Sequence, residues 1–204
     1  MSRSNAAFGI DVVDGERVRA YLPELARLRI AVFRGWPYCY DGNEDYERRY
    51  LETYGRSQRS VFVLARNADT IVGASSGIPL ADEEAAIRRP FDEAGIAIGD
   101  VFYFGESVLM PSHRGLGIGH RFFDEREAFA HRHGFAVTAF CSVVRNADDP
   151  RRPPGYRSND AFWRKRGYLP QPSMRCRLSW TEIGDSEEST HELVFWLRDW
   201  RDAS

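Results

Sequence analysis

The residues best suited to chemistry lie in Arg114–Gly119 (RGLGIG), where three glycines alternate with apolar residues. This run follows a strand-like segment, Val101–Met110, and opens a segment with helical character, Gly117–His133. Glycine has no Cβ, so backbone N–H groups there can approach a ligand closely. The helix start adds unpaired N–H donors and the positive end of the helix dipole. The pattern is typical of a phosphate-binding turn, with Arg114 and Arg121 adding positive charge at its rim.

Two familiar phosphate-binding motifs do not fit this run. The dinucleotide motif GxGxxG would need its third glycine where His120 stands. A Walker loop needs Gly-Lys-Ser/Thr, and the single lysine of the chain, Lys165, is not in such a sequence. A glycine-rich turn that only packs a helix against a strand is the structural alternative.

The run resembles motif A of the GNAT N-acetyltransferase superfamily, R/Q-x-x-G-x-G/A, which follows a strand and a proline, here Pro111. Ala161–Tyr168 is similar to the family's motif B, which ends in Gly-Phe and here in Gly-Tyr. The order of elements from Phe8 to Leu197 also resembles the GNAT plan. The resemblance implies transfer of an acetyl group from acetyl-CoA to a primary amine of a small molecule, by direct attack in a ternary complex and without a metal.

The resemblance also implies which residues would bind CoA. The strand before the glycine run would pair with the pantetheine arm, and the amides of the turn would hold the pyrophosphate. The expected CoA-binding residues are Ser107, Val108, Leu109, Arg114, Gly115, Leu116, Gly117, Ile118, Gly119, His120 and Asn159.

Glu106 is the candidate for handling the amine's proton. An alkyl ammonium has a pKa of about 10, so it must lose a proton before it attacks the thioester. Glu106 lies on the donor strand and could accept that proton through a water molecule, or bind the ammonium. The alternative is a strand-end carboxylate paired with an arginine. Tyr103 is expected to line the same groove.

The general acid for the departing thiolate is less defined. GNAT proteins often carry a tyrosine four residues before the glycine of motif B, where this chain has Trp163. An indole cannot donate that proton. Tyr156, in the preceding loop, is the substitute we expect, and unaided departure of the thiolate is the alternative.

The acceptor side should lie between the first two helices. Their connection holds Tyr38, Tyr40 and Asp41, which suit an ammonium ligand through aromatic faces and a carboxylate. Packing of these aromatics against the sheet is the alternative. The stripe of Tyr46, Tyr50 and Tyr54 on the second helix is expected to belong to the core.

The fold class predicted from the element order is α/β, with a mixed sheet of six or seven strands. The parallel strands Val101–Met110 and Phe135–Val144 should splay apart to open a slot for pantetheine. We expect one domain over residues 8–198, with short tails at 1–7 and 199–204. Helices are expected at Glu16–Phe33, at a second segment with the tyrosine stripe, at Gly117–His133 and at Asn159–Arg166.

Composition narrows the classes of partner. With 204 residues and a net charge of −2, the chain shows no general attraction to nucleic acid or membranes. Its three cysteines are widely spaced, which favours a reduced, cytoplasmic protein. A homodimer is open, because the family includes dimers but no residue pattern here specifies one.

The sequence also contains features of other functional classes. Gly73–Gly77 matches the GxSxG pattern of serine hydrolases, but that elbow needs a helix directly after it and the stretch reads on as strand. His131 and His133 diverge on a helix, which argues against a metal site. Cys141 is expected to be a small buried residue rather than a nucleophile. A GNAT fold that binds acyl-CoA as a sensor, without turnover, is the main competing function.

Overall fold

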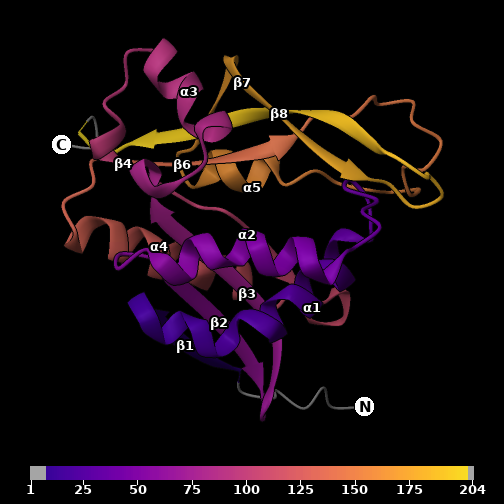
Figure 1. Ribbon diagram of the computed structural model, residues 1–204, viewed down its shortest axis with the longest axis horizontal. Coiled ribbons are helices and arrows are strands. Elements are labelled where there is room, and N and C mark those ends of the chain that lie inside the picture. The colour runs from indigo at the N-terminus through magenta and orange to yellow at the C-terminus, as the bar shows by residue number, and fades with distance from the viewer. Residues whose placement is uncertain (1–7, 202–204) are drawn as a thin grey trace.

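The structure, a computed structural model, describes residues 8–201 and contains one eight-stranded sheet flanked by helices (Figure 1). The strands are β1 (Gly9–Asp14), β2 (Val61–Asn67), β3 (Thr70–Pro79), β4 (Val101–Tyr103), β5 (Ser107–Leu109), β6 (Val137–Val143), β7 (Leu169–Thr181) and β8 (Glu188–Asp199). The α-helices are α1 (Leu22–Phe33), α2 (Glu44–Arg56), α3 (Ala85–Glu93), α4 (Ile118–Arg132) and α5 (Asp160–Lys165). The short 3₁₀ segments are η1 (Gly15–Tyr21), η2 (Leu80–Asp82), η3 (Ile98–Asp100) and η4 (Pro111–His113).

The sheet is mixed, as the sequence predicted. Its order is β1-β2-β3-β4-β6-β8-β7, with β5 also paired to β3. Strands β4 and β6 run parallel, whereas the other strand pairs are antiparallel. There are eight strands rather than six or seven because the predicted strand Val101–Met110 is divided into β4 and β5.

The division between β4 and β5 opens the sheet. Strand β4 pairs with β6 from Val101 to Tyr103, but β5 pairs only with β3. A Cβ at Gly105, in the gap, would stand 1.8 Å from the Tyr54 hydroxyl and 2.8 Å from Ser76 Oγ. Only glycine therefore allows the chain to turn away from β6 at this point. The predicted splay of the two parallel strands is thus present.

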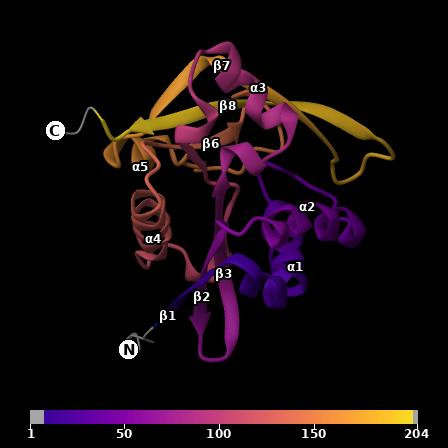
Figure 2. The ribbon, with the colours of Figure 1, turned by 60° about the vertical axis from the view of Figure 1, so that its left-hand side comes forward.

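The helices cover both faces of the opened sheet. Helices α1 and α2 lie on one face and α4 on the other (Figure 2). The predicted first helix begins as η1 and becomes α-helical at Leu22, with Pro23 in its first turn. Helix α2 is capped by Asn43, whose side-chain oxygen accepts a 3.0 Å hydrogen bond from the N–H of Tyr46.

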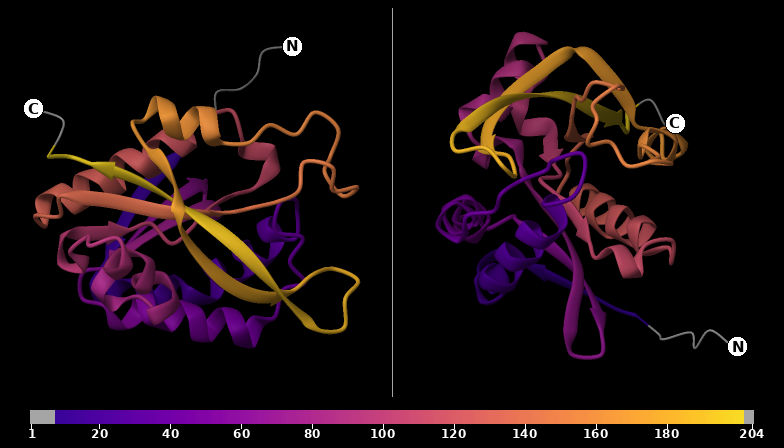
Figure 3. Two further views of the ribbon diagram at one scale, coloured as in Figure 1. Left: turned by 90° about the horizontal axis from the view of Figure 1, so that it is seen from above. Right: turned by 90° about the vertical axis from the view of Figure 1, so that its right-hand side faces the viewer.

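The C-terminal half carries a long hairpin of β7 and β8, which extends beyond the rest of the sheet (Figure 3). The charged connection from Leu80 to Asp100 contains α3, which packs against β7. The folded part continues slightly beyond the predicted boundary, because the Trp200 N–H donates to Ala136 O and its indole N–H to Thr138 Oγ1. The expected tail at 1–7 and the last three residues of the expected tail at 199–204 lie outside the described residues.

The structure also bears on the competing functions. Ser75 of the GxSxG pattern is fully buried inside β3, and no α-helix follows that strand directly. Within residues 8–201, no three His, Cys, Asp or Glu side chains gather as metal ligands. The helices of this part of the chain are all too short or too polar to cross a membrane. The three cysteines are free thiols.

Candidate active site: a long groove that meets an aromatic pocket

The glycine run forms a tight turn at the start of α4. Gly115 and Gly117 have φ angles of 78° and 81°, in the left-handed region that favours glycine. The first N–H groups bonded within the helix are those of His120 and Arg121, which both donate to Gly117 O. The N–H groups of Ile118 and Gly119 precede that first bond. They are therefore available to an anionic ligand, as at other helix N-termini.

A cavity of about 830 Å³, here called the long groove, runs from this turn into the gap in the sheet. One end is bordered by Arg114 and Gly119, and the other by Gly105 and Cys141. Arginines line it from several elements. They are Arg114, Arg126, Arg145, Arg152 and Arg157. The groove thus combines an anion-binding turn with positive charge along its length.

Strand β5 turns part of its backbone toward the long groove. The Ser76 N–H donates to Glu106 O, and the Met110 N–H donates to Val72 O, so these residues bond to β3. Because bonded pairs alternate along an antiparallel ladder, Ser107 and Leu109 turn their peptide groups the other way. These two residues line the groove and can offer backbone donors and acceptors to an extended ligand.

Arg126, on α4, holds the gap in the sheet open. Its guanidinium donates to Ser76 O and Glu106 O at 3.1 and 3.2 Å, and to Ser107 Oγ at 2.9 Å. It is 1% exposed and lies over the ring of Phe104. The bond to Ser76 O gives that carbonyl group a partner where the two strands separate, and Glu106 O accepts from Arg126 in addition to the Ser76 N–H.

A second, smaller cavity of about 110 Å³, here called the aromatic pocket, lies between α1, α2 and the sheet. Its walls are mostly aromatic. They include Phe33, Tyr38, Tyr40, Tyr46, Tyr50, Tyr103 and Trp180. Four residues line both cavities, namely Phe33, Tyr38, Gly105 and Cys141. The long groove and the aromatic pocket therefore meet at the gap between β4 and β5.

Charged groups are buried around this junction. Arg29 of α1 forms ion pairs with Glu47 of α2 and with Glu106. Its guanidinium lies 4.2 Å from the ring centroid of Tyr50. Glu47 is fully buried and lines the aromatic pocket, and its Oε1 has no hydrogen-bond partner among the described residues. The pocket therefore contains a buried carboxylate oxygen that is still able to accept a hydrogen bond.

Glu83 is a further carboxyl group of the aromatic pocket. It follows η2 and is 6% exposed. It accepts a 2.9 Å hydrogen bond from the Tyr54 hydroxyl and a 3.2 Å bond from the Glu84 N–H. Burial raises the pKa of Glu83 to about 7, with Glu106 and Glu84 adding to the rise. Near neutral pH this side chain can both take up and release a proton.

The comparisons with solved structures identify the architecture. A GNAT-family protein from Desulfovibrio desulfuricans superposes with a TM-score of 0.56 at 11% identity, covering 94% of this chain and 99% of that one. The chain has the GNAT fold. The ribosomal-protein-alanine N-acetyltransferase of Brucella melitensis gives 0.59 at 16% identity, covering 93% and 99%. The protein yncA of Salmonella typhimurium, solved with its cofactor acetyl-CoA, gives 0.56 at 13% identity, covering 96% and 95%. No family model and no curated protein matches the sequence.

The predicted CoA residues fall into two groups on this GNAT fold. Those that line the long groove are Ser107, Leu109, Arg114, Gly119 and Asn159. Gly115, Leu116 and Gly117 form the turn beside it, and His120 is exposed on the first turn of α4. The side chains of Val108 and Ile118 point into core clusters, so only their backbones could contribute.

The loop before motif B borders the same groove. Tyr156 lines the groove and makes an edge contact with Trp36. Burial raises the pKa of the Tyr156 hydroxyl, with Asp160 adding to the rise, so the hydroxyl keeps its proton at neutral pH. Trp163 also borders the groove, and its ring packs on Phe140 and Trp196. Trp163 therefore helps to build the wall of the groove.

The predicted acceptor residues are only partly brought together. Tyr38, Tyr40 and Tyr103 line the aromatic pocket. The structure places Asp41 elsewhere, because it is exposed and pairs with Arg34 at 3.3 Å. The expectation that the tyrosine stripe of α2 belongs to the core is correct for Tyr54, which is fully buried. Tyr50 is half-buried, packs against the core and also lines the pocket, whereas the expectation is wrong for Tyr46, which is exposed at the pocket's edge.

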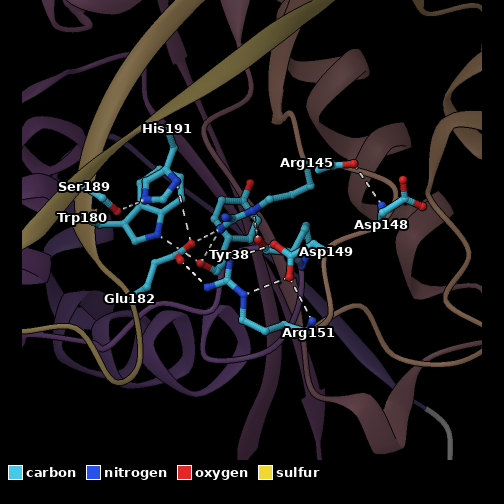
Figure 4. A network of polar contacts seen from close by, with 11 residues as sticks. Tyr38, Arg145, Asp148, Asp149, Arg151, Trp180, Glu182, Ser189 and His191 are labelled. Atoms are coloured by element: carbon cyan, nitrogen blue, oxygen red, sulfur yellow. Dashed lines mark hydrogen bonds and ion pairs between the residues drawn. The ribbon is translucent and has the colours of Figure 1, made fainter.

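Tyr38 is held by a network that joins three segments (Figure 4). Its carbonyl oxygen accepts hydrogen bonds from Arg145 Nη2 at 3.0 Å and from Trp180 Nε1 at 3.1 Å. Glu182, after β7, pairs with Arg145 and Arg151. These bonds tie the loop after α1 to the loop after β6 and to the β7–β8 hairpin. The network thereby fixes a wall that the groove and the pocket share.

Sequence reasoning missed Arg29, Glu47, Glu83 and Arg126. A signal existed for three of them. Arg29, Glu47 and Arg126 fall within the apolar stripes of α1, α2 and α4, so each charge occupies a position expected to be buried. Two opposite charges on the buried faces of successive helices indicate an ion pair. Glu83 lies in a segment without periodicity and gave no such signal.

The raised pKa of Glu83 predicts a pH-dependent stability difference. The native state keeps a proton on Glu83 up to about pH 7, whereas the unfolded chain loses it near 4.5. Below 4.5 both states are protonated and the group has no effect. Between these values the wild-type free energy of unfolding should fall, relative to Glu83→Gln, by up to about 3 kcal/mol.

Urea unfolding of both proteins from pH 4 to 8 measures this difference. Glu93→Gln, which changes an exposed carboxylate that pairs with Arg89, is the control and should follow the wild type. A constant difference between wild type and Glu83→Gln across the range would show that Glu83 titrates normally.

Proposed function

We propose that the protein is an acyl-CoA-dependent N-acyltransferase that moves an acetyl group from acetyl-CoA to a primary amine of a small molecule. The observation that carries this proposal is the meeting of two cavities at Gly105 and Cys141. One cavity has the polarity and length for CoA, and the other has the aromatic and carboxylate lining that suits an ammonium group. Acetyl-CoA bound to yncA, which shares the fold, supports the donor.

In this proposal each part of the long groove has one task. The N–H groups from Gly115 to Gly119 hold the pyrophosphate, because the His120 N–H is already bonded to Gly117 O, and Arg114 adds charge at the rim. The backbones of Ser107 and Leu109 pair with the pantetheine arm. A peptide N–H of β5 stabilises the oxyanion as the amine attacks. The thioester then lies at the junction, with its carbonyl carbon open to the aromatic pocket.

The aromatic pocket would select the acceptor. The free Oε1 of Glu47 can accept a hydrogen bond from the ammonium group, and Tyr38, Tyr40 and Tyr103 enclose it. The pocket's volume of about 110 Å³ admits only a few non-hydrogen atoms. A small amine therefore fits better than a peptide terminus. Tyr156 remains the proposed proton donor to the departing thiolate.

A panel of amines with acetyl-CoA tests the proposal through the loss of thioester absorbance and mass spectrometry of the product. We expect turnover with small primary amines and little with peptides or with alcohols of the same shape. Binding of CoA without transfer to any amine in the panel would favour the alternative of an acyl-CoA sensor.

A further inference from the structure

A continuous chain of side chains links the two buried carboxyl groups of the site. The Tyr54 hydroxyl donates to Glu83 Oε1 at 2.9 Å, and the Tyr50 hydroxyl donates to Glu106 Oε2 at 3.3 Å. The two hydroxyl oxygens lie 3.2 Å apart. The chain therefore runs from Glu83 in the aromatic pocket, through α2, to Glu106 in the long groove.

Counting protons shows what this chain requires. The hydrogen-bond chain has three oxygen–oxygen contacts: Glu83 to Tyr54, Tyr54 to Tyr50, and Tyr50 to Glu106. Each tyrosine hydroxyl carries one hydrogen, so only two hydrogens are present for these three contacts when both carboxylates are ionised. If both hydroxyls donate to the carboxylates, the contact between the two tyrosine oxygens has no hydrogen. One added proton gives every contact a hydrogen, so the hydrogen-bond chain is complete when it holds a single extra proton.

The groups around the hydrogen-bond chain favour the binding of one extra proton at Glu83. Glu106 is already paired with the Arg29 guanidinium, whereas Glu83 has no arginine or lysine partner among the described residues. Burial raises the pKa of Tyr50 and of Tyr54, so neither hydroxyl is lost as an anion. The ionisable groups near Glu83 are Tyr50, Tyr54, Glu84, Tyr103, Glu106 and Cys141.

We propose that Glu83 accepts the proton of the acceptor ammonium and that Tyr54 and Tyr50 relay it to Glu106 on the groove side. This inference rests on the proposed function, because it assigns the proton acceptor of that reaction. The N–H bond of the ammonium breaks, and its electron pair stays on the nitrogen that attacks the thioester carbonyl carbon. The Tyr54 O–H bond first rotates from Glu83 toward the Tyr50 oxygen. Each hydroxyl then passes on its own hydrogen as it receives another, so only hydroxyl hydrogens change position.

The remaining steps balance without another reactant. When the C–S bond breaks, its electron pair leaves with the sulfur. Tyr156 gives its hydroxyl proton to the CoA thiolate, and the second proton of the amine nitrogen restores the hydroxyl. The first proton leaves Glu106 for water in the open groove. The products are the amide, CoA thiol and one released proton.

The pH dependence of kcat/KM tests the relay, measured with acetyl-CoA and the best amine of the panel. The wild-type kcat/KM should fall as the pH drops below about 7, because the proton acceptor Glu83 is then already protonated. Glu83→Gln should reduce kcat/KM at neutral pH on the order of 10²–10⁴-fold. The decrease of kcat/KM below pH 7 that is due to protonation of Glu83 should then be absent. The rate of this variant should then rise with pH as the amine deprotonates by itself.

Tyrosine variants separate the relay from Glu83 acting alone. Tyr50→Phe keeps both carboxyl groups but interrupts the hydrogen-bond chain between them. The loss of kcat/KM at acidic pH should therefore begin at a lower pH, and kcat should fall. Tyr21→Phe, at the end of η1 and lining neither cavity, is the control and should keep the wild-type pH dependence. If kcat/KM of Tyr50→Phe depended on pH in the same way as that of the wild type, the relay would be overturned. Unchanged kinetics in Glu83→Gln would overturn the whole inference.

An infrared titration makes the result independent of the substrate. The free wild-type protein should show the C=O band of a buried carboxylic acid that disappears near pH 7, and Glu83→Gln should lack this band. Its absence from the wild type would overturn the inference even if amines are acetylated. Conversely, a titrating band in a protein that acetylates nothing would place the failure in the proposed function.

Discussion

Gly117→Val is expected to abolish binding of CoA while leaving the fold intact. Gly117 has a φ of 81°, a region that a β-branched residue occupies only with strain. Relief of that strain would turn the N–H groups at the start of α4 away from the pyrophosphate. The wild-type melting temperature should rise by several degrees with CoA, because a ligand at about 100 times its Kd adds about 2.7 kcal/mol.

The same helix offers a matched control for this substitution. Gly134, after the C-terminal end of α4, has a φ of 79°, and no atom lies within 4 Å of a Cβ placed there. Gly134→Val therefore brings similar strain without touching the groove, and it should respond to CoA like the wild type. If Gly117→Val also kept the full response, the pyrophosphate would not lie at this turn.

Glu106→Gln is expected to lower turnover on the order of 10²–10⁴-fold and to move the pH optimum upward. The substitution keeps the shape of the side chain but removes the charge that pairs with Arg29 and accepts the Tyr50 hydrogen bond. Arg29 keeps its second partner, Glu47, so the fold should survive. Steady-state kinetics across pH, with melting temperatures as a check on folding, measure the effect.

Two other results are distinguishable for this variant. A higher KM with nearly unchanged kcat would mean that Glu106 only helps to bind the ammonium. Unchanged kinetics would remove Glu106 from the mechanism and leave it as the partner of Arg29. Glu125→Gln, which breaks an ion pair with Arg121 on the surface of α4, is the control for loss of a carboxylate.

The glycine run and the order of elements were predictable because their signals are local. A turn that needs positive φ angles requires glycine, so the positions of Gly115 and Gly117 indicate the turn directly. The helical stripe of α1 and the cap at Gly134 follow from spacing in the same way. The splay between the parallel strands was also expected, but from the resemblance to GNAT proteins.

The break at Gly105 and the lining of the aromatic pocket could not be predicted from local patterns. Gly105 is required because the Tyr54 hydroxyl, from a distant helix, packs against the chain there. Glu83 reaches the pocket only because η2 turns back over α2 after β3. Both depend on contacts between segments far apart in the sequence, which no periodicity records.

Asp41 was predicted to lie at the acceptor site, but the structure places it outside the pocket. Its position between aromatic residues suggested an acceptor site, yet its side chain points to solvent and pairs with Arg34. The carboxylates that do line the pocket, Glu47 and Glu83, come from α2 and from the end of η2. The predicted tyrosines Tyr38, Tyr40 and Tyr103 therefore do line this pocket, whereas the segments that supply its carboxylates were not predicted.

A crystal structure with acetyl-CoA tests the central claim most directly. The pyrophosphate should lie against the N–H groups from Gly115 to Gly119, and the pantetheine arm should run along Ser107 and Leu109. The thioester carbonyl should reach the junction at Gly105 and Cys141, open to the aromatic pocket. A pyrophosphate bound away from the start of α4, or a thioester that points away from the pocket, would contradict the account.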